Sequence, residues 1–231
     1  GRSLLSVATD GETFGHHQRW GDMALAAAVT RLAGRREVRL ENYASFLAHS
    51  PPTEEVVLVE PSAWSCAHGV ERWRSDCGCK AAPDRPTQQA WRAVLRDGLD
   101  TLAARNHEVF ASELAGRAGD PWALRDAFGE VLDAGEDARR RFALDHLDGT
   151  PSARTIDRVL ELLDMERDAL AMFTSCAWFF DDLAGLEPVQ ALRMAAHAID
   201  LAGPGAQAAE AELRATLARG ESNDPAEGDG A

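Results

Sequence analysis

Basic residues are scarce in this chain. Its 24 Lys and Arg residues are outnumbered by 38 Asp and Glu residues, which gives a formal net charge of -14. A negative field of this size repels phosphate backbones and anionic lipid headgroups. We therefore expect no nucleic acid and no membrane as a partner. Neutral sugars remain compatible with the charge, because short-range hydrogen bonds and aromatic stacking recognise them.

Cysteines and long apolar runs are also scarce. The four cysteines, Cys66, Cys77, Cys79 and Cys176, are too few and too unevenly spaced for the disulfide framework of a small secreted domain. No run of about 18 apolar residues occurs, and the first residues show neither a basic segment leading into an apolar core nor a small-residue cleavage site. The sequence predicts a cytoplasmic protein in a reducing compartment.

Residues 1–65 have α/β character. Strands are predicted at 4–8, 38–40 and 56–59, and helices at 20–33 and 43–48. Asp10 would then follow the C-terminal end of the first strand.

The remaining chain has helical character. A Cys-containing loop followed by Ala-, Leu- and Arg-rich segments predicts an α-helical domain over residues 66–219. The predicted helices span 86–105, 107–116, 121–133, 136–147, 153–173, 188–202 and 205–219. Residues 220–231 are rich in Gly, Asp and Glu and predict a disordered tail. Overall we expect a helix-dominated protein.

Titratable side chains crowd the segment after the first predicted strand: Asp10, Glu12, His16, His17 and Asp22. In α/β barrels the loops after the strands carry the chemistry, and crowded ionisable groups can keep one carboxyl protonated as a general acid. Gly11 and Gly15 allow a sharp turn close to a ligand. A solvated surface loop has the same composition, and adjacent histidines rarely point to one metal ion. The pattern alone therefore leaves catalysis and a plain loop open.

Three segments carry a resemblance to a known family. The stretch A-T-D-G-E-T-F-G-H-H at residues 8–17 resembles the fourth signature of glycoside hydrolase family 57. Residues 62–79 and 173–187 agree, in the same order, with a bacterial subgroup whose barrel is followed by a long, poorly characterised C-terminal domain. The resemblance implies that residues 1–65 are the end of an incomplete (β/α) barrel. It also implies that Asp10 is the general acid/base of a retaining enzyme acting on an α-glucan or maltooligosaccharide.

The same resemblance implies a nucleophilic glutamate upstream, on another barrel strand, so the missing N-terminal barrel portion of the parent chain is an expected partner. Retention requires two carboxyls about 5 Å apart across the scissile bond. Glu12, on the loop of Asp10, would approach the sugar from the same side, so it is expected to orient His16 or to bind a hydroxyl. The isolated chain is expected to be inactive. The alternative is a non-catalytic glucan-binding or assembly module, with or without a structural zinc.

A second motif joins Cys66, His68, Cys77 and Cys79 as C-x-H, eight residues, C-x-C. These ligand types suit tetrahedral zinc, but zinc ligand pairs are usually two or more residues apart. We therefore expect no metal and no cofactor. A structural zinc, a packed loop with buried thiols, and a sugar-binding loop that uses Trp64 and His68 all stay open.

A third motif, W-F-F-D-D at residues 178–182, joins aromatics to carboxylates. The last signature of the resembled family also joins a tryptophan to aspartates near the active site, which implies that Trp178 and Asp181 or Asp182 reach the substrate. Core packing and helix capping are the alternative. The expected substrate contacts are Glu12, His16, His17, Trp64, His68, Trp178 and Asp181.

Overall fold

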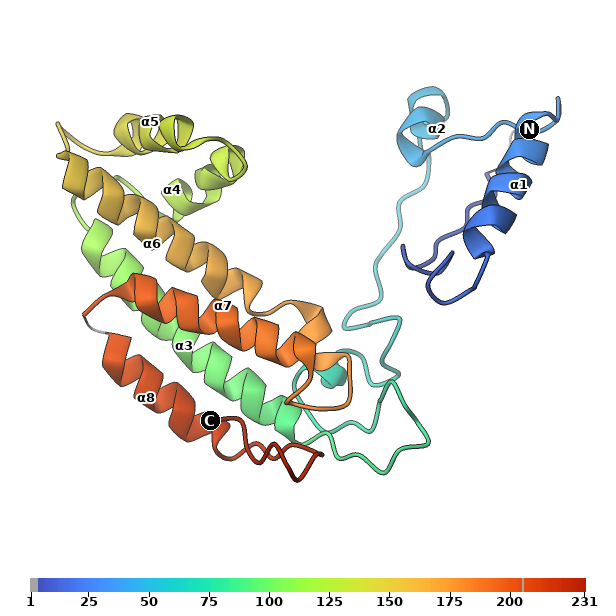
Figure 1. Ribbon diagram of the computed structural model, residues 1–231. Coiled ribbons are helices and arrows are strands. Elements are labelled where there is room, and N and C mark those ends of the chain that lie inside the picture. The colour runs from blue at the N-terminus through green and yellow to red at the C-terminus, as the bar shows by residue number, and fades with distance from the viewer. Residues whose placement is uncertain (1–3, 205) are drawn as a thin grey trace. The chain divides into compact units, whose positions relative to one another are not determined.

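The computed structural model describes residues 4–204 and 206–231 (Figure 1). The chain forms two compact units, unit 1 over Gly1–Leu58 and unit 2 over Val59–Ala231. The boundary lies close to residue 65, where the sequence predicted the start of the helical domain. Helices dominate the structure, as predicted.

Unit 1 contains α1 (Gly21–Ala33) and α2 (Tyr43–His49), both close to their predicted positions. α1 carries Asp22 in its first turn and Arg31 in its last turn, and both charges complement the helix dipole. α2 begins after Asn42, whose side chain accepts a 2.8 Å hydrogen bond from the backbone N–H of Ser45. This bond satisfies one of the free N–H groups of the first turn.

The segments predicted as strands in unit 1 form no strand in the structure. Residues 4–8, 38–40 and 56–59 pair with no neighbour, and Leu5 and Val57 expose 93% and 95% of their surfaces. A strand needs a neighbouring strand to bind its backbone N–H and C=O groups. The described residues of unit 1 supply no such neighbour, and none of them is buried. Unit 1 therefore shows neither a sheet nor a core of its own within residues 4–58.

Unit 2 is a helical domain. Its α-helices are α3 (Trp91–Leu114), α4 (Pro121–Phe128), α5 (Glu136–His146), α6 (Ala153–Ala171), α7 (Leu186–Ala202) and α8 (Ala206–Leu217). Short 3₁₀ turns occur at η1 (Glu71–Trp73), η2 (Gly129–Val131) and η3 (Ser175–Trp178). α4 and α6 start at the side-chain caps Asp120 and Ser152. The sequence predicted two helices, 86–105 and 107–116, where the structure has the single helix α3. Asn106, at the predicted break, is buried inside this helix and does not end it.

Two apolar cores lie between these helices, of which α3, α6, α7 and α8 run alongside one another (Figure 1). One core joins the C-terminal half of α3 to α4, α5 and α6 and contains the fully buried Phe110 and Met165. The other joins the N-terminal half of α3 to η3, α7 and α8 around Trp91 and Leu99. Each such side chain contributes about 1.5–3 kcal/mol when fully buried. The second core fixes the start of α3, where the Cys-containing loop ends.

The segment at residues 220–231, for which the composition predicts disorder, takes a defined turn in the structure. The hydroxyl of Ser222 and the backbone N–H of Asn223 donate hydrogen bonds of 2.9 and 2.7 Å to the carboxylate of Asp182. The side-chain amide of Asn223 also donates to the backbone carbonyl of Asp181 at 2.7 Å. These specific partners hold a segment whose own residues are polar and small.

Within residues 4–204 and 206–231, every helix is too short or too polar to cross a membrane.

Candidate metal centre and candidate catalytic loop

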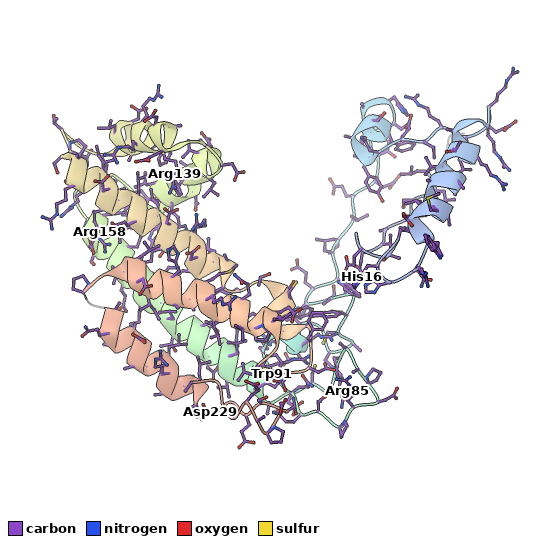
Figure 2. All side chains as sticks on the ribbon, in the orientation of Figure 1. His16, Arg85, Trp91, Arg139, Arg158 and Asp229 are labelled. Atoms are coloured by element: carbon purple, nitrogen blue, oxygen red, sulfur yellow. The ribbon has the colours of Figure 1, made fainter. Side chains whose placement is uncertain are left out.

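The loop of Asp10 in unit 1 is exposed along its length. The backbone N–H of Thr13 donates to the carbonyl of Asp10 at 3.1 Å, and Gly15 adopts the left-handed φ of 115° that the sequence led us to expect of a glycine turn. Asp10, Glu12, His16 and His17 are all solvent-accessible (Figure 2 labels His16). Glu12 was expected to orient His16 or to bind a sugar hydroxyl, and its carboxylate lies 3.7 Å from Nε2 of His17. The loop thus presents its carboxyls and imidazoles to solvent.

The Cys-x-His and Cys-x-Cys pairs of unit 2 form one cluster. The Sγ atom of Cys66 lies 3.9 Å from the Sγ atoms of both Cys77 and Cys79, and the Sγ atom of Cys79 lies 3.5 Å from Nδ1 of His68. All four ligand atoms lie within 4.8 Å of one another, and all the cysteines are free thiols. We call these four residues the Cys₃His cluster. Its atoms are of the types that bind soft and borderline metal ions.

A glycine in the left-handed conformation lets both cysteines of the short Cys-x-Cys pair reach the cluster. Gly78 has a φ of 81°, and this conformation turns the backbone so that Cys77 and Cys79 reach the same group of ligands. Gly69, next to His68, has a φ of 77° and would place a Cβ 3.1 Å from the backbone carbonyl oxygen of Pro61. Only glycine adopts such a conformation at little cost. The sequence reasoning weighed the one-residue gaps and missed Gly78, the residue that compensates for them.

Hydrogen bonds prepare one thiol of the cluster for ionisation. Burial acts to raise the pKa of Cys66, but hydrogen bonds from the backbone of His68 and Arg72 and from the neighbouring thiols outweigh it and lower the pKa to about 7. Burial raises the pKa of Cys77, and the thiols of Cys79 and Cys66 act in the same direction. The cluster therefore offers a thiolate, the form that binds metal, near neutral pH.

Two buried arginines attach the loop of the cluster to the helical domain. Arg72 donates to the backbone carbonyls of Ser65 and Phe179 at 2.8 and 2.6 Å, and its guanidinium lies 4.2 Å from the ring centre of Phe179. Arg92, at the start of α3 beside Trp91 (Figure 2), donates to the carbonyl of Cys79 at 2.6 Å. Within residues 4–204 and 206–231, neither guanidinium has a carboxylate in ion-pair distance, and Nε of each lacks a hydrogen-bond partner.

The two tryptophans expected to bind sugar differ in their exposure to solvent. Trp64 exposes 80% of its surface and lies 5.9 Å from the ring of Phe179, so it offers a free aromatic face. Trp178 is 1% exposed, and its Nε1–H donates to the backbone carbonyl of Arg92 at 3.1 Å. The structure thus gives Trp178 the core position that was the alternative interpretation, and this burial leaves it no surface for a sugar.

Asp181 has a structural partner on each carboxylate oxygen. The backbone N–H groups of Ala81 and Ala82 donate to them at 2.8 and 2.7 Å. Asp181 also lines an open cavity of about 650 Å³ together with Phe180 and Arg85. Its hydrogen bonds are those of a residue that holds the end of the loop in place.

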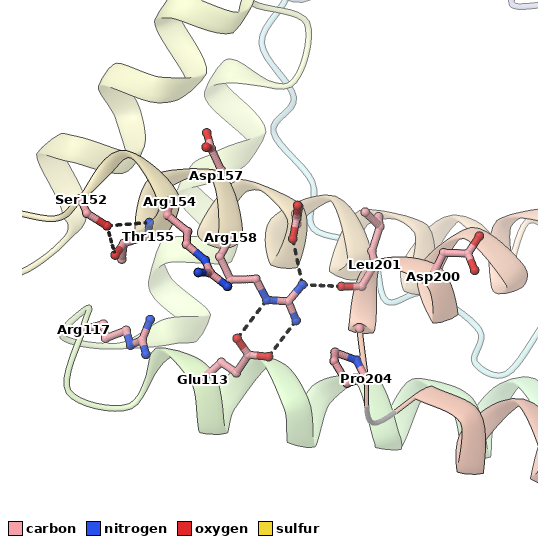
Figure 3. A pocket seen from close by; sticks show the side chains of 12 residues that line it. Glu113, Arg117, Ser152, Arg154, Thr155, Asp157, Arg158, Asp200, Leu201 and Pro204 are labelled. Atoms are coloured by element: carbon pink, nitrogen blue, oxygen red, sulfur yellow. Dashed lines mark hydrogen bonds and ion pairs between the residues drawn. The ribbon is translucent and has the colours of Figure 1, made fainter.

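A larger cavity, of about 810 Å³, lies between α3, α6 and the end of α7 (Figure 3). Its central cation, Arg158, donates to both carboxylate oxygens of Glu113 at 3.0 and 2.7 Å and to the backbone carbonyl of Leu201 at 2.7 Å. These hydrogen bonds lower the pKa of Glu113. Arg158 therefore serves to join three helices, because its donors are taken up inside the protein.

The comparisons with known proteins cover the helical domain. The family model described as "Domain of unknown function (DUF3536)" matches residues 88–231. No curated protein and no solved structure matches the chain. The match begins just before α3, so it includes α3 to α8 and leaves out the Asp10 loop and the Cys₃His cluster.

Proposed function

The chain belongs to the family described as domain of unknown function DUF3536, and on that premise we propose that it is the C-terminal part of a retaining enzyme acting on α-glucans. Asp10 is the general acid/base of this enzyme. The observation that carries the proposal is the D-G-E-T-F-G-H-H segment, whose carboxyls and imidazoles lie exposed on one glycine-turned loop. It resembles the acid/base signature of glycoside hydrolase family 57, and a poorly characterised domain follows the barrel in the resembled subgroup.

The proposed mechanism assigns two proton transfers to Asp10. Its carboxyl protonates the glycosidic oxygen while a glutamate, from another strand of the barrel, attacks the anomeric carbon. The carboxylate of Asp10 then takes a proton from the incoming water or sugar hydroxyl, which breaks the glycosyl–enzyme bond. Glu12 and His17, paired at 3.7 Å, and the neighbouring His16 are the side chains proposed to bind sugar hydroxyls beside Asp10. The acceptor, water or sugar, decides between hydrolysis and transglycosylation.

The apolar surface of unit 1 supports a position inside a larger catalytic domain. Leu5, Val57 and the neighbouring apolar residues of the predicted strands are exposed, as are Met23 and Val29 on α1. So many exposed large apolar side chains in one unit are typical of a surface that another polypeptide covers. We propose that this polypeptide is the preceding part of the barrel, which supplies neighbouring strands and the nucleophile. The proposed setting is the cytoplasm, where the free thiols of unit 2 stay reduced.

The test is the hydrolysis of a chromogenic maltooligosaccharide by the full-length protein that contains this chain. Asp10→Asn should reduce kcat by a factor of about 10²–10⁴, the usual contribution of a general acid. Asp22→Asn is the matched control, because Asp22 lies in the same segment but interacts with the first turn of α1. Equal activity of the wild type and Asp10→Asn would contradict the proposal, as would hydrolysis of the substrate by residues 1–231 alone.

A second candidate function is a non-catalytic glucan-binding module in unit 2. The observation that favours it is Trp64, an exposed indole beside Phe179, since aromatic faces stack on glucose rings. Isothermal titration with maltoheptaose should then show binding that Trp64→Ala removes and Asp10→Asn leaves unchanged. Binding that both variants retain would argue against this function.

A further inference from the structure

We propose that the Cys₃His cluster binds one structural Zn²⁺ ion through the thiolates of Cys66, Cys77 and Cys79 and Nδ1 of His68. The ion ties together residues 66–79, a segment that Arg72 attaches to Phe179 and that Arg92 attaches to the start of α3. This inference does not depend on the catalytic role of Asp10.

The distances between the ligand atoms fit a tetrahedral ion. Bonds of about 2.3 Å to sulfur and about 2.0 Å to nitrogen place two sulfurs about 3.8 Å apart, and a sulfur and a nitrogen about 3.5 Å apart. The two distances from Cys66 are 3.9 Å and that from Cys79 to His68 is 3.5 Å. The widest separation in the cluster is at most 4.8 Å, and a contraction of about 1 Å completes the tetrahedron. These thiols therefore already lie near the positions of zinc ligands.

Two buried arginines beside the cluster complement the negative charge of a zinc–thiolate centre. Arg92 is 0% exposed and donates a 2.6 Å hydrogen bond to the backbone carbonyl of Cys79. Arg72, at 4% exposed, also lies beside the cluster, and neither arginine forms an ion pair with a carboxylate of the described residues. Buried guanidinium groups stay charged and need a counter-charge. Three thiolates with one Zn²⁺ leave a net negative charge that supplies it.

The ligand set also selects the metal and its role. Thiolate with imidazole favours zinc over the hard cations, which prefer oxygen ligands. Four protein ligands leave no open position for water or substrate, so the site is structural. The loop needs such a support, because over residues 59–90 its only regular structure is the single turn η1. The ion, Arg72 and Arg92 thus act on the same stretch of chain.

Metal analysis of the full chain, purified under reducing conditions and reconstituted with Zn²⁺, tests this proposal. We expect about one zinc per chain. Replacement by Co²⁺ should give the intense visible bands of a tetrahedral ion and a thiolate-to-cobalt charge-transfer band whose intensity corresponds to three sulfurs. Cys77→Ser should lower zinc affinity strongly and weaken the charge-transfer band. Cys176→Ser is the matched control, because Cys176 is exposed and lies outside the cluster, and it should keep both signals.

A backbone variant tests whether the conformation of the loop, with all four ligands kept, determines the affinity for zinc. Gly78→Ala keeps all four ligands but places alanine at a φ of 81°, and it should weaken zinc binding about tenfold. Gly129→Ala should leave zinc binding unchanged, because Gly129 has a helical conformation and a Cβ added there would meet open space. The proposal is overturned if the reduced wild-type chain binds no zinc, if iron or copper replaces it, or if zinc binding survives both Cys66→Ser and Cys77→Ser.

Discussion

The buried guanidinium of Arg92 donates a 2.6 Å hydrogen bond to the backbone carbonyl of Cys79. A second hydrogen bond, of 3.2 Å, goes to the carbonyl of Phe180. One side chain at the start of α3 therefore holds both the loop of the Cys₃His cluster and the segment that follows η3. These hydrogen bonds satisfy the guanidinium of an arginine that is buried beside an apolar core.

Arg92→Met should lower the free energy of unfolding by about 2–4 kcal/mol, because the carbonyls of Cys79 and Phe180 lose the donor of a fully buried side chain and each unsatisfied group costs about 1–3 kcal/mol. Arg214→Met is the control, since Arg214 forms an exposed ion pair with Glu210 on α8. That variant should change stability by less than about 0.5 kcal/mol. Urea unfolding followed by the helical circular dichroism signal gives both values. Similar small losses in the two variants would show that Arg92 does not join the loop to the domain.

Glu166 on α6 should make the stability of unit 2 depend on pH. Its side chain is fully buried, and burial raises the pKa of its carboxyl against the opposing effects of His107 and Arg125. The folded state thus binds this proton more tightly than the unfolded chain does. The contribution to stability is fully present below the unfolded pKa of about 4.3 and is lost as the pH rises through the folded pKa. The contribution of Glu166 to stability should therefore decrease as the pH rises from the unfolded pKa to the folded pKa of its carboxyl.

The pH effect is tested by comparing wild type with Glu166→Gln, which cannot ionise. The Tm of Glu166→Gln relative to wild type should increase as the pH rises from about 4 to about 8. Glu161→Gln, on the exposed side of the same helix, should follow the wild-type dependence. A Tm difference between Glu166→Gln and wild type that stays constant across the range would contradict the assignment.

Trp178 and Trp64 should respond oppositely to replacement. Trp178→Ala should lower the free energy of unfolding by about 3–5 kcal/mol, the usual cost of removing a buried tryptophan. Trp64→Ala should change stability by no more than about 0.5 kcal/mol, since its ring is exposed. If unit 2 binds glucan, only Trp64→Ala should weaken maltoheptaose binding in a folded protein. Urea unfolding measures the effect of each variant on stability, and titration measures its effect on maltoheptaose affinity. A free energy of unfolding that Trp178→Ala leaves unchanged would contradict the core position of Trp178.

The sequence predicted the helices of unit 2 well because their signals are local. Asp120 followed by Pro121 starts α4, and the apolar period of α6 begins directly after the cap Ser152. The break expected before His107 did not occur, because the core decides whether a helix continues through a polar residue such as Asn106. Local chemistry thus determined most helix starts, and packing determined their lengths.

The sites were harder to predict, because they depend on contacts between distant residues. Trp64 and Trp178 are the same residue type beside similar neighbours, and the tertiary packing of α3 and α7 around η3 buries only Trp178. The Cys₃His cluster depends on the left-handed conformation of Gly78, which the ligand spacing does not reveal. Strands at 4–8 and 56–59 require neighbours that the described part of unit 1 does not contain.

The most direct test of the account is the dependence of catalysis on the leaving group when Asp10 is removed from the full-length protein. Asp10→Ala should lose activity toward natural α-glucans by a factor of about 10²–10⁴ but keep the first step on an aryl α-glucoside whose phenol leaves without protonation. Added azide should restore turnover and yield the α-glucosyl azide, the product of net retention. Equal loss on both substrates without azide rescue, or no loss at all, would contradict Asp10 as the general acid/base.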